Sequence, residues 1–141
     1  MSVATKRETF RGADLLGVSS PSEIAYLERI DRGLPTGSID RFMRATGLSE
    51  QAMDAIIPRR TRNRQRGRDR LSAEQSDRLA RAADIYALAY EVFGERERAN
   101  GWMKRPNAAF GDEPPTALLR TSTGATLVEE VLVRIAHGVY S

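Results

Sequence analysis

The sequence predicts an all-α protein made of short, capped helices. Two observations favour this fold class: apolar residues recur at helical spacing in several segments, and capping residues stand before them with glycine or proline after them. A third is that strand signals are scarce, because no alternating apolar and polar run is bounded by turns. A chain of 141 residues suits one domain, or two small helical units that share a core.

Three short helices are expected in the first half, after residues 1–19, which show no clear period. Each should begin at a capping residue and end at a glycine or a proline. The expected starts are a capping box at Ser20, Pro21, Ser22 and Glu23 with the proline in the first helical position, then Ser38, then Ser49. The expected ends are Gly33, Gly47 and Pro58, so the third helix spans residues 50–57.

Positive charge is concentrated in the segment RRTRNRQRGRDR, residues 59–70, where a short basic helix is expected to run to about Gly67. This segment holds seven arginines and one acid, and residues 1–70 carry 14 Lys and Arg against nine Asp and Glu. Residues 71–141 carry eight against ten. The first half is therefore expected to meet a polyanion, since a planar guanidinium favours bidentate contacts to phosphate or guanine.

The order of a capped helix, a turn containing Pro58 and an arginine-rich helix is that of a helix-turn-helix motif, whose second helix enters the major groove of DNA. The expected DNA-binding residues are Arg59, Arg60, Thr61, Arg62, Asn63, Arg64 and Arg66. Several of the arginines would contact phosphates, and one or two of them, or Asn63, would contact base edges. The alternative is a solvated basic linker between two helical units.

The second half opens with another capping box, Ser72 with Gln75 in the reciprocal position, before the longest helix. The apolar stripe expected on this helix comprises Leu79, Ala82, Ala83, Tyr86, Tyr90 and Phe93. A polar helix over residues 95–102, a Pro- and Gly-rich stretch over residues 105–115 and a final helix should follow. The apolar face of the final helix is expected to be Leu127, Val128, Val131, Leu132 and Ile135.

The last forty residues contain a distinctive order of residues. It comprises Trp102, Pro106, Asn107, Gly111, Pro114, Leu118, Leu119, Thr121 and Gly124, then Arg134-Ile135-Ala136-His137-Gly138-Val139-Tyr140-Ser141. This order resembles the toxin-binding domain of the Xre/MbcA/ParS antitoxins, strongly over roughly residues 72–141 and more weakly before them. The resemblance implies an Xre-like helix-turn-helix DNA-binding domain over residues 1–70 and a small helical toxin-binding domain over residues 71–141.

The resemblance also implies a function. An antitoxin of a type II toxin–antitoxin system binds and inhibits its toxin, and it binds operator DNA to regulate its own operon. The usual partner in this family is a RES-domain toxin, an enzyme that degrades NAD, and residues 135–141 would lie in or across its NAD pocket. A homodimer within the toxin–antitoxin complex is also implied, because a two-fold DNA site suits a dimeric reader. The alternative is a stand-alone transcriptional regulator or a partner-binding adaptor without a toxin.

The residues expected to bind the toxin are Trp102, Asn107, Thr121, Arg134, Ile135, His137, Gly138, Val139, Tyr140 and Ser141. Four of them also have a simpler structural interpretation. A lone Trp102 more commonly anchors a core, and both roles can hold if it braces the Pro- and Gly-rich loop. Asn107 can cap the turn that follows it, Thr121 or Ser122 can cap the final helix, and His137 can stabilise a helix C-terminus. Gly111 and Gly124 are both expected to allow close approach of two backbones.

Composition argues against several other classes. The chain has no cysteine, so disulfides and Cys-ligated zinc are excluded, and its one histidine lacks partners for a metal site; no cofactor is expected. With no run of 18 apolar residues and no secretory signal, we expect a cytoplasmic protein that spans no membrane. Glu129 and Glu130 are adjacent on a helix and point to different sides, so they cannot form an acid–base pair, and no enzyme is expected.

Overall fold

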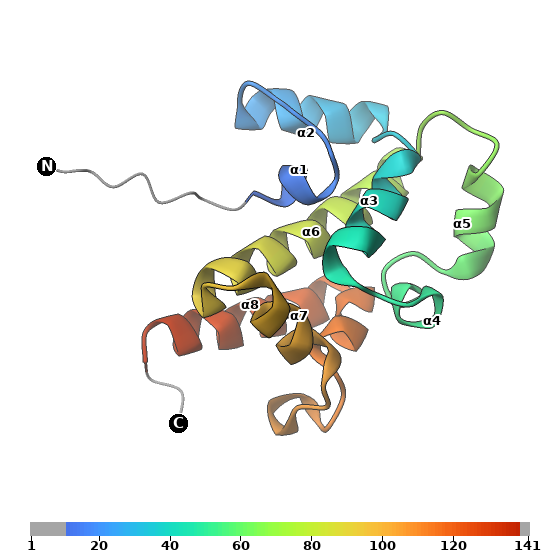
Figure 1. Cartoon of the computed structure of the whole chain (residues 1–141). Helices are drawn as coiled ribbons and strands as arrows, with labels where there is room; N and C mark the ends of the chain where they lie inside the picture. The colour runs from blue at the N-terminus through green and yellow to red at the C-terminus, as the bar shows by residue number, and fades with distance from the viewer. Residues whose placement is uncertain (1–10, 139–141) are drawn as a thin grey trace, which may run out of the picture.

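A computed structural model describes residues 11–138, which are helical apart from turns and two isolated β-bridges (Figure 1). The α-helices are α1 (Gly12–Leu15), α2 (Glu23–Arg32), α3 (Gly37–Thr46), α4 (Glu50–Met53), α5 (Arg59–Gln65), α6 (Ala73–Phe93), α7 (Arg96–Lys104) and α8 (Ser122–Ala136). The two 3-10 helices are η1 (Ala108–Phe110) and η2 (Pro115–Arg120). The all-α prediction is confirmed. In the described part of the chain, no helix has the length and apolar character needed to cross a membrane.

The longest helix, α6, runs through the middle of the molecule (Figure 1). Helices α1, α2 and α3 pack on it from the first half of the chain, and α7 and α8 pack on it from the second. Its buried residues therefore cover most of the helix circumference, and Asp77, Asp84 and Glu91 stay exposed on one side. The buried residues are Ser76, Leu79, Ala80, Ala82, Ala83, Ile85, Tyr86, Ala87, Ala89 and Tyr90. The predicted stripe was too narrow, because small alanine side chains let neighbouring helices approach α6 on several sides.

Both halves of the chain contribute to the core around α6. Phe42 of α3 packs edge-on against Tyr86 of α6, with ring centroids 5.4 Å apart. The Tyr86 hydroxyl is hydrogen-bonded to Thr116 Oγ1 of η2 at 2.7 Å, and Thr116 donates to the backbone oxygen of Met103 in α7 at 2.8 Å. Burial raises the pKa of Tyr86 well above its usual value, so this hydroxyl stays neutral. One buried side chain thus connects α3 to the elements that follow α6.

Two of the expected helix starts are confirmed. Ser49 Oγ accepts a hydrogen bond from the Ala52 amide at the start of α4, and Ser72 Oγ accepts one from the Gln75 amide at the start of α6, both at 3.1 Å. Gln75 does not complete the second capping box, because its Oε1 is buried without a partner among the described residues. The helix after Ser49 is shorter than predicted, since α4 ends at Met53 and a turn follows.

Two other helix starts were predicted wrongly. Ser22, rather than Ser20, caps α2, so Pro21 precedes the helix instead of occupying its first position. Ser38 lies inside α3, where its buried hydroxyl donates to the backbone oxygen of Leu16 at 2.9 Å. A buried hydroxyl must form a hydrogen bond with a group that the tertiary fold places beside it. Here that group is a backbone oxygen outside α3, so the hydroxyl donates to it instead of accepting from an amide of its own helix.

Candidate functional site

Helices α4 and α5 form a helix-turn-helix unit at one side of the molecule (Figure 1). The turn between them is fixed by the backbone oxygen of Met53, which accepts from the amides of Ile56 at 2.9 Å and Ile57 at 3.0 Å. Both isoleucines are fully buried. Pro58 then starts α5, because its φ of −55° suits the entry to a helix and it has no amide hydrogen to leave unpaired. The unit therefore presents α5 as a separate, projecting helix.

Most of the predicted DNA-binding residues lie on the solvent side of α5. Arg59, Arg60, Asn63 and Arg64 are exposed, and their spacing places them on one face of the helix. Arg66, directly after the helix, is exposed as well. We call these five residues the arginine face. Several guanidinium groups and one amide on a single helix face can contact phosphates and base edges together.

Two members of the predicted set lie elsewhere. Thr61 is half-buried, and its Oγ1 accepts a weak hydrogen bond from Arg64 at 3.4 Å. Arg62 points into the protein and has only 6% of its side chain exposed. The structure does not support Arg62 as a DNA contact, because its guanidinium is already used inside the molecule.

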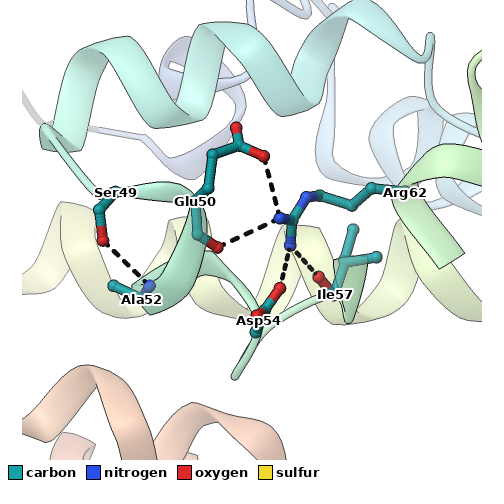
Figure 2. A network of polar contacts seen from close by, with 6 residues as sticks. All are labelled: Ser49, Glu50, Ala52, Asp54, Ile57 and Arg62. Atoms are coloured by element: carbon teal, nitrogen blue, oxygen red, sulfur yellow. Dashed lines mark hydrogen bonds and ion pairs between the residues drawn. The ribbon is translucent and has the colours of Figure 1, made fainter. Parts of the chain in front are cut away.

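Figure 2 shows how the Arg62 guanidinium is held. Its Nη1 donates to Asp54 Oδ1 at 2.9 Å and to the backbone oxygen of Ile57. Its Nη2 donates to the side chain and to the backbone oxygen of Glu50, both at 3.1 Å. Its acceptors therefore come from α4 and from the turn that leads to α5. No sequence pattern distinguishes Arg62 from the other six arginines of residues 59–70, because its partners are set by the tertiary fold.

The second candidate surface is built on α7, η1, η2 and α8, where the predicted toxin-binding residues lie. Trp102 of α7 is half-buried between Phe93 at the end of α6 and Phe110 of η1, with ring centroids 5.5 and 6.1 Å away. Asn107 Oδ1 accepts from the Ala109 amide at 2.9 Å and caps η1. Trp102 therefore braces the Pro- and Gly-rich loop, and Asn107 shapes it.

Helix α8 begins where the sequence predicted. Thr121 Oγ1 accepts from the Gly124 amide at 2.9 Å and caps the helix. A Cβ atom at Gly124 would lie 2.0 Å from the backbone oxygen of Leu118, so the expected close approach of two backbones is confirmed there. The same expectation was wrong for Gly111: an added Cβ would meet no described atom within 4 Å, and glycine suits this position because φ is 65°. The residues that α8 buries are Gly124, Ala125, Val128, Val131 and Leu132.

The opposite side of α8 carries apolar groups that the core does not cover. Leu127 is 47% exposed and Val133 is 40% exposed. Leu127 was predicted to lie on the buried face, which was wrong: Val128 lies at the centre of that face, and Leu127 is rotated about 100° away from it. Leu127 and Val133 share the exposed side with Arg134 and His137, at intervals of three, four and seven residues.

The C-terminal members of the predicted set occupy the far end of α8. Arg134 is exposed and reaches Glu130 at 4.0 Å, and Ile135 is half-buried against the core. His137 follows the helix as its C-cap residue, and Gly138 has a φ of 70°. The remaining three, Val139, Tyr140 and Ser141, lie outside the described residues.

The structure does not gather the predicted toxin-binding residues into one cluster. Thr121 and His137 flank a helix of 15 residues and are 16 positions apart, about 24 Å at 1.5 Å per residue. Trp102 and Asn107 belong to the loop region that precedes α8. A partner that touches all of them must therefore extend along the length of α8. Among the described residues, no three His, Asp or Glu side chains are grouped closely enough to hold a metal ion.

The fold and the arginine face define a helix-turn-helix protein that carries a second helical unit after the central helix. Comparison with protein families agrees with both parts. Residues 25–84 match the antitoxin Xre-like helix-turn-helix domain, and residues 88–138 match the antitoxin Xre/MbcA/ParS C-terminal toxin-binding domain. The junction between the two matches lies within α6.

Three relatives, each named antitoxin Xre, share much of the chain. The one from Pseudomonas putida is 44% identical over 118 residues, which cover 83% of this chain and 74% of the relative. The one from Yersinia enterocolitica is 37% identical over 102 residues, covering 71% and 63%, and the one from Photorhabdus laumondii is 29% identical over 116 residues, covering 79% and 78%. The chain belongs to the Xre antitoxin family, with a helix-turn-helix domain followed by a toxin-binding domain.

Proposed function

We propose that this antitoxin binds operator DNA through the arginine face of α5 and inhibits a RES-type, NAD-degrading toxin through its C-terminal segment. The observation that carries the DNA part is the arginine face itself: four exposed arginines and Asn63, on or next to the second helix of a helix-turn-helix unit. A basic helix face of this kind suits the major groove and the flanking phosphates. Binding there would repress the antitoxin's own operon.

The toxin part of the proposal rests on the family match and on the exposed side of α8. Leu127 and Val133 offer apolar surface that a partner can cover, and Arg134 and His137 continue that side toward the C-terminal end. Residues 135–141 would then reach the toxin's active site and keep NAD out. There Tyr140 can stack on the pocket, and the carboxylate of Ser141 can pair with basic groups that would otherwise hold phosphate.

The proposal includes the molecular setting. A homodimer would present two α5 helices to the two halves of an operator, within a complex that also contains the toxin. Both operator and toxin would be met in the cytoplasm. No cofactor is required, because inhibition by occlusion involves no chemistry on the antitoxin.

One experiment tests the toxin part directly. The chain is co-expressed with the product of the neighbouring reading frame, the complex is purified, and NAD consumption by the isolated partner is measured against added antitoxin. We expect a partner that consumes NAD and is silenced at a fixed molar ratio. A co-purifying partner that does not consume NAD would overturn the RES assignment, and an active partner that the antitoxin leaves unaffected would overturn inhibition.

A further inference from the structure

Helix α5 is unusual in having no apolar residue to hold it. Its sequence is RRTRNRQ, and the only residues it buries are Arg62 and Gln65. Gln65 Oε1 has no hydrogen-bond partner among the described residues. A helix of seven residues is also too short to be stable by its own backbone hydrogen bonds. The orientation of α5 must therefore depend on a polar contact.

Arg62 supplies that contact. Its two terminal nitrogens reach four acceptors, two on Glu50, one on Asp54 and one on Ile57 (Figure 2). The acceptors lie five to twelve residues earlier in the chain, so the guanidinium joins the start of α4, the turn and the middle of α5. The planar group fixes direction as well as distance, because its donors have a rigid arrangement.

We infer that Arg62 is a positioning residue: it sets the orientation of α5 on α4 and so places the arginine face for DNA, without touching DNA itself. This inference rests on the proposed DNA binding. It divides the arginines of α5 into two kinds that sequence cannot separate. Arg59, Arg60 and Arg64 act through charge at the surface, and Arg62 acts through geometry in the interior.

The two kinds respond differently to salt. Each phosphate contact contributes about 0.9 to the slope of log affinity against log salt concentration. Replacing Arg60 by alanine should reduce the magnitude of this negative slope by about that amount. Replacing Arg62 by methionine, which keeps apolar volume but cannot donate, should weaken binding roughly tenfold at fixed salt, as for the loss of one good base contact, and leave the slope unchanged.

The carboxylates provide a second test. Glu50→Gln and Asp54→Asn should each weaken DNA binding in the wild-type chain, although neither residue carries a charge that DNA would attract. In the Arg62→Met background the same changes should have little further effect, since the network they belong to is already broken. If these two changes instead strengthened DNA binding in both backgrounds, their effect would come from long-range charge alone, and the network would have no role in positioning α5.

Hydrogen exchange makes the inference independent of the proposed function. In the full-length chain, Arg62→Met should speed amide exchange in residues 59–65 and leave α6 and α8 protected, whereas Arg60→Ala should change neither. The positioning role would be overturned if α5 kept its protection in the Arg62→Met chain. It would also be overturned if the salt slope of that chain were smaller in magnitude by about 0.9 than the wild-type slope. A wild-type chain that binds no operator DNA would overturn the proposed function instead.

Discussion

Helices α5 and α8 carry the two proposed binding surfaces, yet they are held to the protein by opposite means. Helix α8 buries an apolar face against α6, including the fully buried Val128 and Leu132. Helix α5 buries Arg62 and Gln65 and no apolar side chain. Apolar burial fixes α8 in a way that depends on buried area and little on salt. The polar network fixes α5 in a way that depends on the geometry of each hydrogen bond.

The difference also concerns energy. Full burial of a Val or Leu side chain contributes about 1.5–3 kcal/mol each. A buried ion pair gains much less, because the loss of hydration offsets most of the attraction between the charges. We therefore expect α8 to be part of the stable core, and α5 to be the element most easily displaced by a single substitution.

Cutting the chain before Leu71 should have the largest effect. It tests the division at residue 70, which stays a prediction. The cut removes Phe42 from its contact with Tyr86 and removes the Leu34 amide, which donates to Ser76 Oγ at 2.8 Å. We expect residues 71–141 to lose cooperative unfolding, as followed by circular dichroism in urea. A fragment that unfolds as sharply as the full chain would show that the second half has a core of its own.

Leu132→Ala should have the next largest effect. It leaves a cavity between α8 and α6, where the side chain is fully buried, and should lower the free energy of unfolding by about 2–5 kcal/mol. The matched control is Leu127→Ala on the exposed side of the same helix, which should cost no more than about 0.5 kcal/mol. The control should nevertheless weaken toxin binding. Equal losses of stability in the two variants would remove the distinction between the two sides of α8.

Removal of residues 138–141 should separate binding from stability. These residues follow α8 and its apolar face, so the free energy of unfolding should change by well under about 2 kcal/mol. Inhibition of the toxin should weaken far more, and Tyr140→Ala alone should cost about 2 kcal/mol, roughly thirtyfold in affinity. The assay is toxin NAD consumption against titrated antitoxin. A shortened chain that inhibits as well as the full one would assign the affinity to Trp102 and its loop.

Asp84→Asn should have the smallest effect. Burial, and then the charges of Glu129 and Glu23, raise the pKa of Asp84 on α6 to about 6. A raised pKa means that the folded chain holds the proton more tightly than the unfolded chain, so wild-type stability should rise as the pH falls through about 6 toward 4. Because Asp84 reaches solvent, the variant should gain no more than about 2 °C in Tm at pH 7.5. A gain that persists near pH 4 would contradict this cause.

The sequence was sufficient wherever a local pattern decides the structure. Ser49, Ser72 and Thr121 cap the helices expected of them, and Asn107 caps the turn after it, because a cap involves only residues within three positions. The predicted cap at Ser38 was wrong, because its hydroxyl donates to a backbone oxygen 22 residues away in the sequence. A distant partner of this kind leaves no periodic signal in the sequence.

The candidate sites divide in the same way. The position of the helix-turn-helix unit follows from Pro58 and the arginine-rich segment after it, and both are visible in the sequence. The inward turn of Arg62 is not visible there, because it depends on Glu50 and Asp54 lying beside it in space. The exposure of Leu127 is a similar case, since only the packing of α8 decides which of two adjacent apolar residues is covered.

The central claim is that the protein carries two separate binding surfaces on one core. One measurement tests it most directly: the salt dependence of operator binding by a variant in which Arg59, Arg60 and Arg64 are changed to alanine. If the wild-type chain contacts six phosphates, its slope of log affinity against log salt should be about −5, and the variant's slope should be shallower, about −3. The variant should still neutralise the toxin at the wild-type ratio. An unchanged slope, or loss of toxin neutralisation together with DNA binding, would contradict the account.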